Sequence, residues 1–534
     1  MSGLFKNNLI VAVGTALSRV TGLLRFAVLA AVLGGTAISD AYLLANETPN
    51  LVYELLVGGV LSATLVPLFT SFDANDDDES RNVVLTTALA LIVVVTLAAV
   101  AVAPLVFRVF SQNVDPDVDA DLFRSVGTTL ARIFLVQILF YGITGIANAY
   151  LNSKRRFFAA AWSPVLPNLI IIATLLSIPE PAAGEFVLSD ILNDSRLRLT
   201  LGLGATLGIG AMALTLVPAV YAAGLRPKFV WNLRHPAVKK LLTLSFWTLG
   251  FVASNIVALI VIRNLTEPGS SNATAYIAAF TFFILPHGLL GVSIATTFQP
   301  EMARAVANHD KESFIKSASL GIRMTALVTI PAGFGLFVLR RPLIGAAFEY
   351  QDFTAEDALT ASRALAGLAL GLGGYSIYRF VLRGFYAHQD TKTAFKVHLV
   401  QSLINIVLGL ILVGSFGVLG LGAALAIAHV VATIWALQIL SYKVPGFELR
   451  EIYLSLFRIL VASALMGESV WFVTRNIGAN SGGGAFGRLI VGTIVGVAVY
   501  GALLTTMGAP ELNALRRRLP GASRTPRPDA AITD

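Results

Sequence analysis

Two arginines lie inside the first long apolar stretch of the chain. Arg19 and Arg25 are six residues apart, and the stretch 7–34 holds no other charged residue. A charge at membrane depth costs about 2.5–3.5 kcal/mol on insertion scales, so it usually faces a polar cavity or a partner and marks a transport pathway. Because the planar guanidinium matches two phosphate oxygens at once, a pair of arginines suits a diphosphate. The pair therefore predicts an anion site inside a membrane protein.

The spacing of the two arginines sets a condition on their helix. Six residues correspond to about 9 Å along the axis of a straight helix but to about 120° around it. Arg19 and Arg25 would therefore not share one face. Gly22 lies between them, and we expect a bend or local unwinding there to turn both side chains toward one cavity.

The second apolar stretch carries acids at a regular spacing. Asp40, Glu47 and Glu54 are seven residues apart, so on a helix they form one slowly drifting stripe. An acid at this depth must pair with a cation or take up a proton. Two coupling or gating roles are open for Glu47 and Glu54: counter-ions that hold Arg19 and Arg25 before substrate enters, or proton carriers. For Glu47, a structural pair with a neighbouring span is the alternative.

The elements that must position these charges are membrane helices. Hydrophobic residues make up 56% of the 534 residues and charged residues only 13%, against about 25% charged residues in a soluble domain. The absence of cysteine excludes disulfides, a thiolate nucleophile and a cysteine metal site. The net charge of +8 does not indicate a nucleic-acid surface, because the lysines and arginines lie mainly in short loops and in the tail.

Windows of about 20 apolar residues predict the spans themselves. The fourteen predicted spans lie near residues 7–34, 39–70, 83–107, 127–151, 158–178, 199–223, 238–263, 273–303, 317–339, 358–384, 395–415, 418–441, 452–474 and 487–507. An even number of spans places both termini on the same side of the membrane.

Loop charge decides which side that is. With the N-terminus inside, the basic clusters at 154–156, 226–240 and 516–518 face the cytoplasm, and the opposite loops hold far fewer lysines and arginines. The positive-inside rule therefore predicts that both termini are cytoplasmic. The acidic loop 73–79 would also lie inside, although acidic residues count little in this rule.

An internal repeat organises the spans. Pro49 and Pro286 are offset by 237 positions, and so are Asn168 and Asn405. Both prolines fall inside long spans, where a break in the helix makes them candidate gating positions. Because both halves begin inside, the repeat is parallel, as in many transporters. Chance matches of proline and asparagine in a biased sequence are the alternative explanation.

The repeat predicts the domain organisation. We expect an all-α polytopic membrane protein of about 14 transmembrane helices, with one six-helix lobe in residues 1–230 and a repeat-related six-helix lobe in residues 231–445. Residues 446–507 supply two additional C-terminal helices. Residues 508–534 form a basic cytoplasmic tail that lies against anionic lipid.

Short motifs also occur in a fixed order along the chain. They are Ser18-Arg19-Val20-Thr21-Gly22-Leu23-Leu24-Arg25, Asp40-Ala41-Tyr42 with Pro49-Asn50-Leu51, Gly59 to Ala63 with Val66-Pro67, Leu151-Asn152-Ser153 with Arg156-Phe157 and Pro164, Leu285-Pro286 with Gly288-Leu289 and Gly291 to Thr296, and Phe385-Tyr386-Ala387 with Asp390-Thr391-Lys392-Thr393. In these motifs the chain resembles the MurJ/MviN family of the MOP exporter superfamily, over essentially its whole length.

The resemblance implies a function as well as a fold. Members of this family are lipid II flippases, so we expect a transporter and not an enzyme, without a cofactor or metal, in the plasma membrane of a bacterium. Rocking lobes would expose the Arg19 and Arg25 cavity first inward and then outward, while the lipid tail follows a groove beside the last two spans. The resemblance also places Asp40 at the mouth of the cavity as a substrate-binding residue. The expected partners are lipid II, membrane lipids and candidate proteins of cell-wall synthesis or division, with no nucleic acid.

The chain departs from the family pattern at several positions. The family commonly has an arginine after the Pro-Asn-Leu turn of span 2, where this chain has Tyr53 and Glu54, and another before the Leu-Pro of span 8, where it has Thr281. The cavity is therefore expected to be less cationic. Three arginines near predicted span ends are candidate substitutes, although such places favour a boundary charge: Arg263, Arg379 and Arg383.

A second departure concerns ions. Some members bind sodium through carboxylates of spans 7 and 11, but here those spans offer Asn255 and Asn405. We therefore expect no sodium site and a dependence on the membrane potential.

Three other kinds of function fit the sequence less well than a flippase. A MATE-like drug antiporter or a polysaccharide-lipid exporter of the same superfamily fits the span number and the motifs less well. A membrane transferase that uses a polyprenyl diphosphate would need clustered acids or a base facing the substrate; the acidic run 75–79 has no second acidic motif beside it and is better explained as a solvated loop. A scaffold without transport would not require buried arginines.

Overall fold

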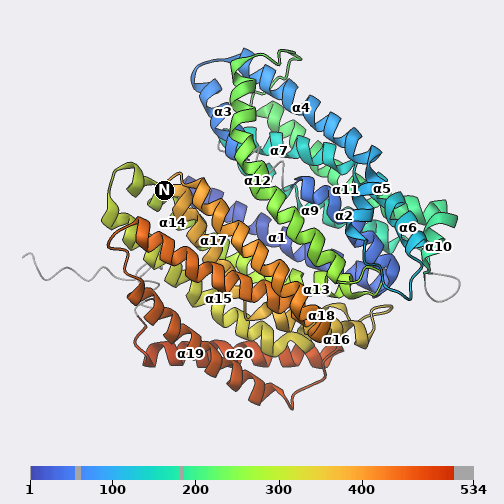
Figure 1. The fold of residues 1–534 in the computed structure, drawn as a ribbon, viewed down its shortest axis with the longest axis vertical. Helices are drawn as coiled ribbons and strands as arrows, with labels where there is room; N and C mark the ends of the chain where they lie inside the picture. The colour runs from blue at the N-terminus through green and yellow to red at the C-terminus, as the bar shows by residue number, and fades with distance from the viewer. Residues whose placement is uncertain (1, 54–61, 155, 181–185, 510, 512–534) are drawn as a thin grey trace, which may run out of the picture.

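The computed structural model describes residues 2–53, 62–154, 156–180, 186–509 and 511. Within these residues the chain is a bundle of long helices without a β-strand (Figure 1). This confirms the predicted all-α fold class.

The first half of the chain forms one group of helices. Its elements are α1 (Ser2–Leu33), α2 (Ala37–Tyr53), α3 (Ser62–Ala74), α4 (Asp78–Ala101), α5 (Ala103–Phe110), α6 (Ala120–Phe134), α7 (Gln137–Ser153), α8 (Phe158–Trp162), α9 (Val165–Leu176), α10 (Leu188–Asn193) and α11 (Ser195–Ala222). Its core contains fully buried aromatic side chains, among them Phe69, Phe107, Phe123, Phe134 and Tyr150. In Figure 1, α1 runs between this group and the second half of the chain.

The second half forms another group; in Figure 1 it lies below the first, except for its first helix, which runs alongside α4. Its elements are α12 (Pro236–Leu265), α13 (Asn272–Pro286), the π-helical η2 (His287–Gly291), α14 (Val292–Ala307), α15 (Lys311–Phe348), α16 (Ala355–Ala369), α17 (Leu372–Ala387) and α18 (Thr391–Lys443). Helix α12 packs on α18 and also touches α4 and α5 of the first half. It is therefore one of the places where the two halves meet.

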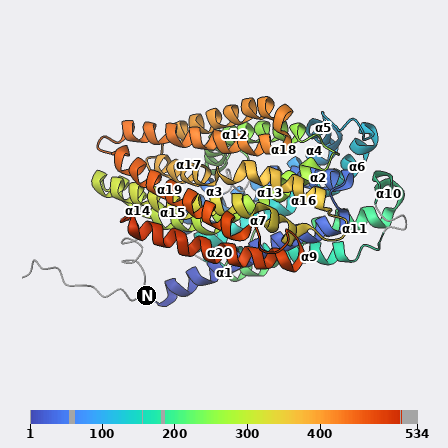
Figure 2. The same ribbon diagram turned by 90° about the horizontal axis from the view of Figure 1, so that it is seen from below.

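Two further helices complete the bundle. Helices α19 (Leu449–Thr474) and α20 (Gly482–Thr506) pack on each other and on α15 at the outer edge of the second half (Figures 1 and 2). Their outward faces carry large apolar side chains such as Phe457, Ile494 and Val497. Such a surface suits contact with lipid.

Each predicted span overlaps a helix or two successive helices in the described residues. Ten of these helices are long and apolar enough to cross a membrane, or eleven if the bent pair α16 and α17 is one span. The 53 residues of α18 form two helices joined at a kink, and together they are long enough to cross the hydrocarbon core twice. The kink is at Gly417, whose φ of 54° lies in the left-handed region that favours glycine. Span predictions 11 and 12 fall on its two parts, and the total of fourteen stays a prediction.

The two prolines that are offset by 237 positions lie within helical segments. Pro49 is inside α2. Pro286 ends α13, and the chain continues as one π-helical turn before α14 begins. A proline removes a backbone hydrogen bond and weakens the helix around it, so both are suited to bending.

The same turn connects several helices at one end of the bundle. In each case a residue with positive φ, namely Asp76, His309 or Gln389, precedes an aspartate that caps the next helix. Hydrogen bonds from Ser80 and Ser313 hold the pKa values of Asp77 and Asp310 below their usual range. Burial raises the pKa of Asp390, but bonds from Lys443 and Thr393 outweigh it and lower the pKa to about 2. The turns at Asp77 and Asp310 are 233 positions apart, so they do not share the 237-residue offset of the predicted repeat, which stays a prediction.

Candidate functional site

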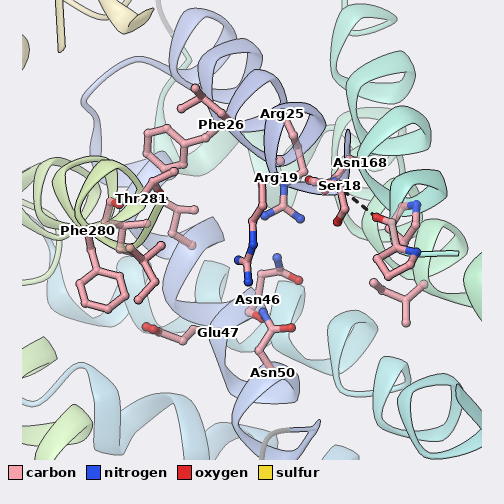
Figure 3. A pocket seen from close by; sticks show the side chains of 18 of the residues that line it. Ser18, Arg19, Arg25, Phe26, Asn46, Glu47, Asn50, Asn168, Phe280 and Thr281 are labelled. Atoms are coloured by element: carbon pink, nitrogen blue, oxygen red, sulfur yellow. Dashed lines mark hydrogen bonds between the residues drawn. The ribbon is translucent and has the colours of Figure 1, made fainter. Parts of the chain in front are cut away.

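Arg19 and Arg25 line one cavity between the two halves of the chain. The cavity measures about 430 Å³ and is bounded by α1, α2, α7, α9, α11 and α13. In Figure 3 both side chains extend from α1 toward the open space, and the Arg19 guanidinium points toward Asn46, Glu47 and Asn50. The two charges that the sequence singled out are thus brought to a single polar site.

The helix that carries them is not deformed as expected. Helix α1 is continuous through Gly22 from Ser2 to Leu33, so the predicted bend or unwinding is absent. The long arginine side chains reach the same cavity from a regular helix, because their flexible stems allow the charged heads to converge. Gly22 instead lies against Asn168, whose Nδ2 would be 3.6 Å from a Cβ at this position.

Neither guanidinium is neutralised by a side chain that the structure describes. Within the described part of the chain, no ion pair and no hydrogen bond involves the side chain of Arg19 or Arg25. The Arg19 side chain lies over Gly288 in η2, where an added Cβ would be 3.5 Å from its Nε. The Arg19 side chain therefore reaches from α1 to the π-helical turn after Pro286. Its charge is available to a ligand.

Amide side chains form the other polar part of the cavity wall. Asn46 accepts a hydrogen bond from Gln137 Nε2 at 3.3 Å, and Asn50 Oδ1 accepts one from the Tyr141 hydroxyl at 2.6 Å. These bonds fix α2 to α7. The sequence analysis did not predict Asn46 and Asn50. They follow Leu43 by three and seven residues, and all three residues line the cavity. This helical spacing is the pattern that would have indicated them.

Asn168 stabilises the opposite wall of the cavity, where α9 packs on α1. Its Nδ2 donates to the backbone oxygen of Ser18 at 3.1 Å and to Thr21 Oγ1 at 3.0 Å. These contacts hold α9 against the turn of α1 that carries Arg19. One member of the Asn168 and Asn405 repeat pair thus has a structural role beside the arginines.

Glu47 pairs with Arg263 of α12. Arg263 Nε lies 2.6 Å from Glu47 Oε2, and Nη2 lies 2.7 Å from Oε1. The guanidinium also lies over the Tyr276 ring, 5.6 Å from its centre. Glu47 therefore does not act as the counter-ion of Arg19 or Arg25 in this conformation, and Arg263 is not available as a substitute phosphate contact.

Asp40 does not line the cavity, contrary to the expectation from the family resemblance. Its carboxylate is completely buried and accepts hydrogen bonds from Gly269 N at 2.9 Å, Thr274 N at 2.8 Å and Thr274 Oγ1 at 2.6 Å. The backbone N–H groups at the start of a helix lack partners within that helix, and a carboxylate is a favourable acceptor for them. Asp40 of α2 thus caps α13 and holds the two halves together.

A third contact joins the halves on the same side. Asn264, at the end of α12, accepts from the backbone nitrogens of Gln112 and Asn113 at 2.6 and 3.3 Å, and its Nδ2 donates to Val109 O at 2.8 Å. Together with Asp40 and Glu47, this closes the space between α2, α5 and the α12–α13 hairpin.

The remaining predicted positions are distributed around this site. Glu54 lies outside the described residues, so its place in the acidic stripe is not determined. Thr281 lines the cavity, and its hydroxyl donates to Ile277 O. Arg383 donates to Gln299 Oε1 at 2.8 Å, away from the cavity.

A second cavity of about 460 Å³ adjoins the first and is lined from α2, α12, α13, α17 and α18. Asn255 and Asn405 both face it, as does Arg379. Among its described lining residues the only carboxylate is Glu47, which Arg263 already holds. Asn255 and Asn405 offer neutral amide oxygens and no charge that would balance a sodium ion.

Comparisons with known proteins agree on one family. The family model described as "Lipid II flippase MurJ" matches residues 29–489. A probable lipid II flippase MurJ of Haemophilus influenzae is 28% identical and covers 94% of this chain and 100% of its own length. The lipid II flippase MurJ of Burkholderia cenocepacia is 30% identical over 79% of this chain and 82% of its own length.

Solved structures show the same fold. The structure titled "Lipid II flippase MurJ, inward closed conformation" matches with a TM-score of 0.77 at 22% identity, over 95% of this chain and all of that chain. A MATE family multidrug resistance transporter of the MOP superfamily, in an inward-facing conformation, matches with a TM-score of 0.63 at 14% identity, over 80% of this chain and 95% of that chain.

Proposed function

The chain belongs to the MurJ family of lipid II flippases, and from this premise we propose that its central cavity carries the diphosphate of lipid II across the membrane. The observation that supports this most strongly is the pair of unneutralised guanidiniums, Arg19 and Arg25, in one cavity between the halves. Two guanidiniums can each hold two phosphate oxygens. The protein needs to make no chemical bond.

The contacts around Asp40, Glu47 and Asn264 act as the gate on the opposite side from the substrate entrance. They join α2 and α5 to the α12–α13 hairpin. The positive-inside rule predicts that this hairpin lies at the outer surface. Outward opening must separate these partners. Because the Arg19 side chain lies over Gly288, a diphosphate drawn to Arg19 also approaches the irregular segment η2, where Pro286 allows bending.

The electrical gradient is the driving force that suits this cavity. Moving a negative charge outward is favoured by about 2.3 kcal/mol per charge for each 100 mV of inside-negative potential. Among the lining residues that the structure describes, the cavity next to Asn255 and Asn405 has no free carboxylate for sodium. The flippase therefore uses the membrane potential for export.

The long lipid tail stays in the bilayer beside α19 and α20. These helices pack on α15 and keep large apolar side chains exposed. With both termini in the cytoplasm of a bacterium, the protein collects lipid II from the inner leaflet of the plasma membrane. The MATE-like alternative is supported only by likeness of fold at low identity.

The proposal is tested by replacing each arginine in cells depleted of their own lipid II flippase. Arg19→Ala and Arg25→Ala should fail to support growth while reaching the membrane in normal amounts. Arg132→Ala is the matched control, because Arg132 is an exposed arginine of α6 that lines neither cavity, and it should support growth. Growth with both cavity variants would overturn the assignment of the cavity.

A further inference from the structure

Four uncharged polar side chains gather on one side of the second cavity. Asn255 comes from α12, and Gln401, Ser402 and Asn405 come from successive turns of α18. The last three are 4%, 4% and 6% exposed. They are therefore buried within the protein and open only to the cavity.

These side chains have no hydrogen-bond partner in the part of the chain that the structure describes. Asn405 Oδ1 is enclosed by the protein and makes no hydrogen bond, so the part of this amide that is open to a ligand is Nδ2. Buried side-chain polar atoms are nearly always hydrogen-bonded, and each exception needs an explanation. Two amides and a hydroxyl on one face of α18, aimed at a cavity, are explained by a ligand that supplies the missing bonds.

The chemistry of the cavity indicates what kind of group this is. A side-chain amide both donates and accepts, so a row of amides matches a ligand that carries amides and hydroxyls of its own. Aromatic side chains complete the lining: Tyr276, Phe280, Tyr375 and Tyr378. Aromatic rings cover the apolar faces of a ligand while the polar groups fix its orientation. The Arg379 guanidinium, which bonds to the Tyr375 hydroxyl at 3.2 Å, disfavours a cation.

The two cavities adjoin. Glu47, Asn50, Phe280 and Thr281 line both of them, and Figure 3 shows Glu47 and Asn50 on the side toward which the Arg19 guanidinium points. A ligand whose diphosphate is held by Arg19 and Arg25 therefore has the second cavity next to it.

We propose that the second cavity binds the uncharged, amide- and hydroxyl-bearing part of the headgroup, its N-acetylated sugar, next to the diphosphate. This inference rests on the proposed function, which supplies a ligand with both parts. It gives the flippase a way to distinguish a loaded carrier lipid from the bare diphosphate carrier, because only the loaded lipid satisfies Gln401 and Asn405.

The test compares three lipids on the purified full-length protein in nanodiscs: lipid II, undecaprenyl diphosphate and undecaprenyl diphosphate N-acetylglucosamine. Asn405→Leu and Gln401→Leu should each weaken lipid II binding about five- to tenfold, the usual worth of one buried hydrogen bond, and leave binding of undecaprenyl diphosphate unchanged. The same loss with the single-sugar lipid assigns the contact to the sugar. A loss confined to lipid II would overturn the sugar assignment in favour of the peptide.

Folding does not confound these variants. Replacing an unpaired buried amide by an apolar group of similar size is close to neutral, so the melting temperatures should stay at or above that of the parent. Gln438→Leu is the matched control, since Gln438 is an exposed residue of the same helix that lines neither cavity, and it should bind all three lipids normally.

The remaining outcomes separate this inference from the function on which it rests. Equal losses for lipid II and undecaprenyl diphosphate, or no loss for either, would contradict the headgroup subsite. So would a sodium dependence of lipid II binding that Asn405→Leu abolishes, because it would mark a cation site. Arg19→Gln should weaken both lipids; if it weakens neither, the diphosphate site fails, whatever the second cavity does.

Discussion

The carboxylate of Glu47 and the guanidinium of Arg263 make a two-point ion pair between α2 and α12, with distances of 2.6 and 2.7 Å. The pair lies at the boundary of the two cavities, since Glu47 lines both and Arg263 lines the second. It is also one of the contacts that close the halves on one side. One ion pair thus connects the substrate site to the gate.

Removing one partner of this pair should cost stability. Glu47→Gln leaves the buried Arg263 without its counter-charge, and breaking a buried pair costs about 3–5 kcal/mol. We expect a lower melting temperature and a lower yield. Pairing the change with Arg263→Met should restore the melting temperature, because neither charge then remains buried.

The double variant also tests the gate. A stable Glu47→Gln and Arg263→Met protein should open more readily to the outside. The chain has no cysteine, so a single cysteine placed at Thr281 reports accessibility without background. Faster labelling from the outside than in the parent supports a gating role, whereas unchanged labelling would leave Glu47 with a purely structural role.

Asp40 should matter for closure and not for substrate affinity. Asp40→Asn loses the negative charge and one of the two acceptor oxygens that hold Gly269 and Thr274. We expect about a tenfold loss of transport, since hydrogen bonds to a charged acceptor contribute about 1.5–3 kcal/mol. Lipid II binding should stay normal. Asp117→Asn, an exposed aspartate in the loop before α6, is the control; reduced binding in Asp40→Asn alone would instead favour the substrate-binding role.

Acid should weaken the turn between α17 and α18. The pKa of Asp390 is lowered to about 2 in the folded protein, against about 3.9 in an unfolded chain. A carboxylate with a depressed pKa stabilises the fold above the unfolded value, and this stabilisation is lost as the pH falls from about 4 to about 2. Asp390→Asn should therefore lower the melting temperature at neutral pH and flatten its decline over this range. Parallel melting curves would contradict the role of Asp390.

Transport should follow the membrane potential and not the sodium gradient. Dissipating the potential at constant sodium should stall translocation, because the electrical work on the diphosphate is lost. Removing sodium at constant potential should change little, since none of the described residues that line the cavity at Asn255 and Asn405 is a free carboxylate. An arrest caused by sodium removal alone, in vesicles or cells, would show that these amides do hold the ion.

Much of the fold follows from the sequence, because the bilayer forces apolar stretches into helices. The predicted spans fall on helices; the span 273–303 is interrupted after Pro286, and Gly417 separates the two spans predicted on α18. The arginine pair was also predictable, since a charge within an apolar stretch is expensive and needs a function. Its helix was predicted wrongly: α1 stays regular at Gly22, because long side chains converge without a bend.

Contacts between the halves were not predictable in the same way. The partner of Glu47 lies 216 residues away, and those of Asp40 lie 229 and 234 residues away. Spacing along one helix shows which residues share a face, but not which helix that face meets. For the same reason the amides of Asn46 and Asn50 were missed, although they flank the arginines.

The central claim is that Arg19 and Arg25 together carry the diphosphate through the membrane. It is tested most directly by translocation of lipid II in vesicles that contain only the purified protein, with the potential imposed. The parent and Arg132→Ala should move lipid II at equal rates. The translocation rate of the Arg19→Ala and Arg25→Ala double variant should not exceed the rate in protein-free vesicles. The corresponding lysine variants should recover only part of the parental rate, because lysine keeps the charge but not the two-point contact. Translocation by the double alanine variant at the parental rate would contradict the account.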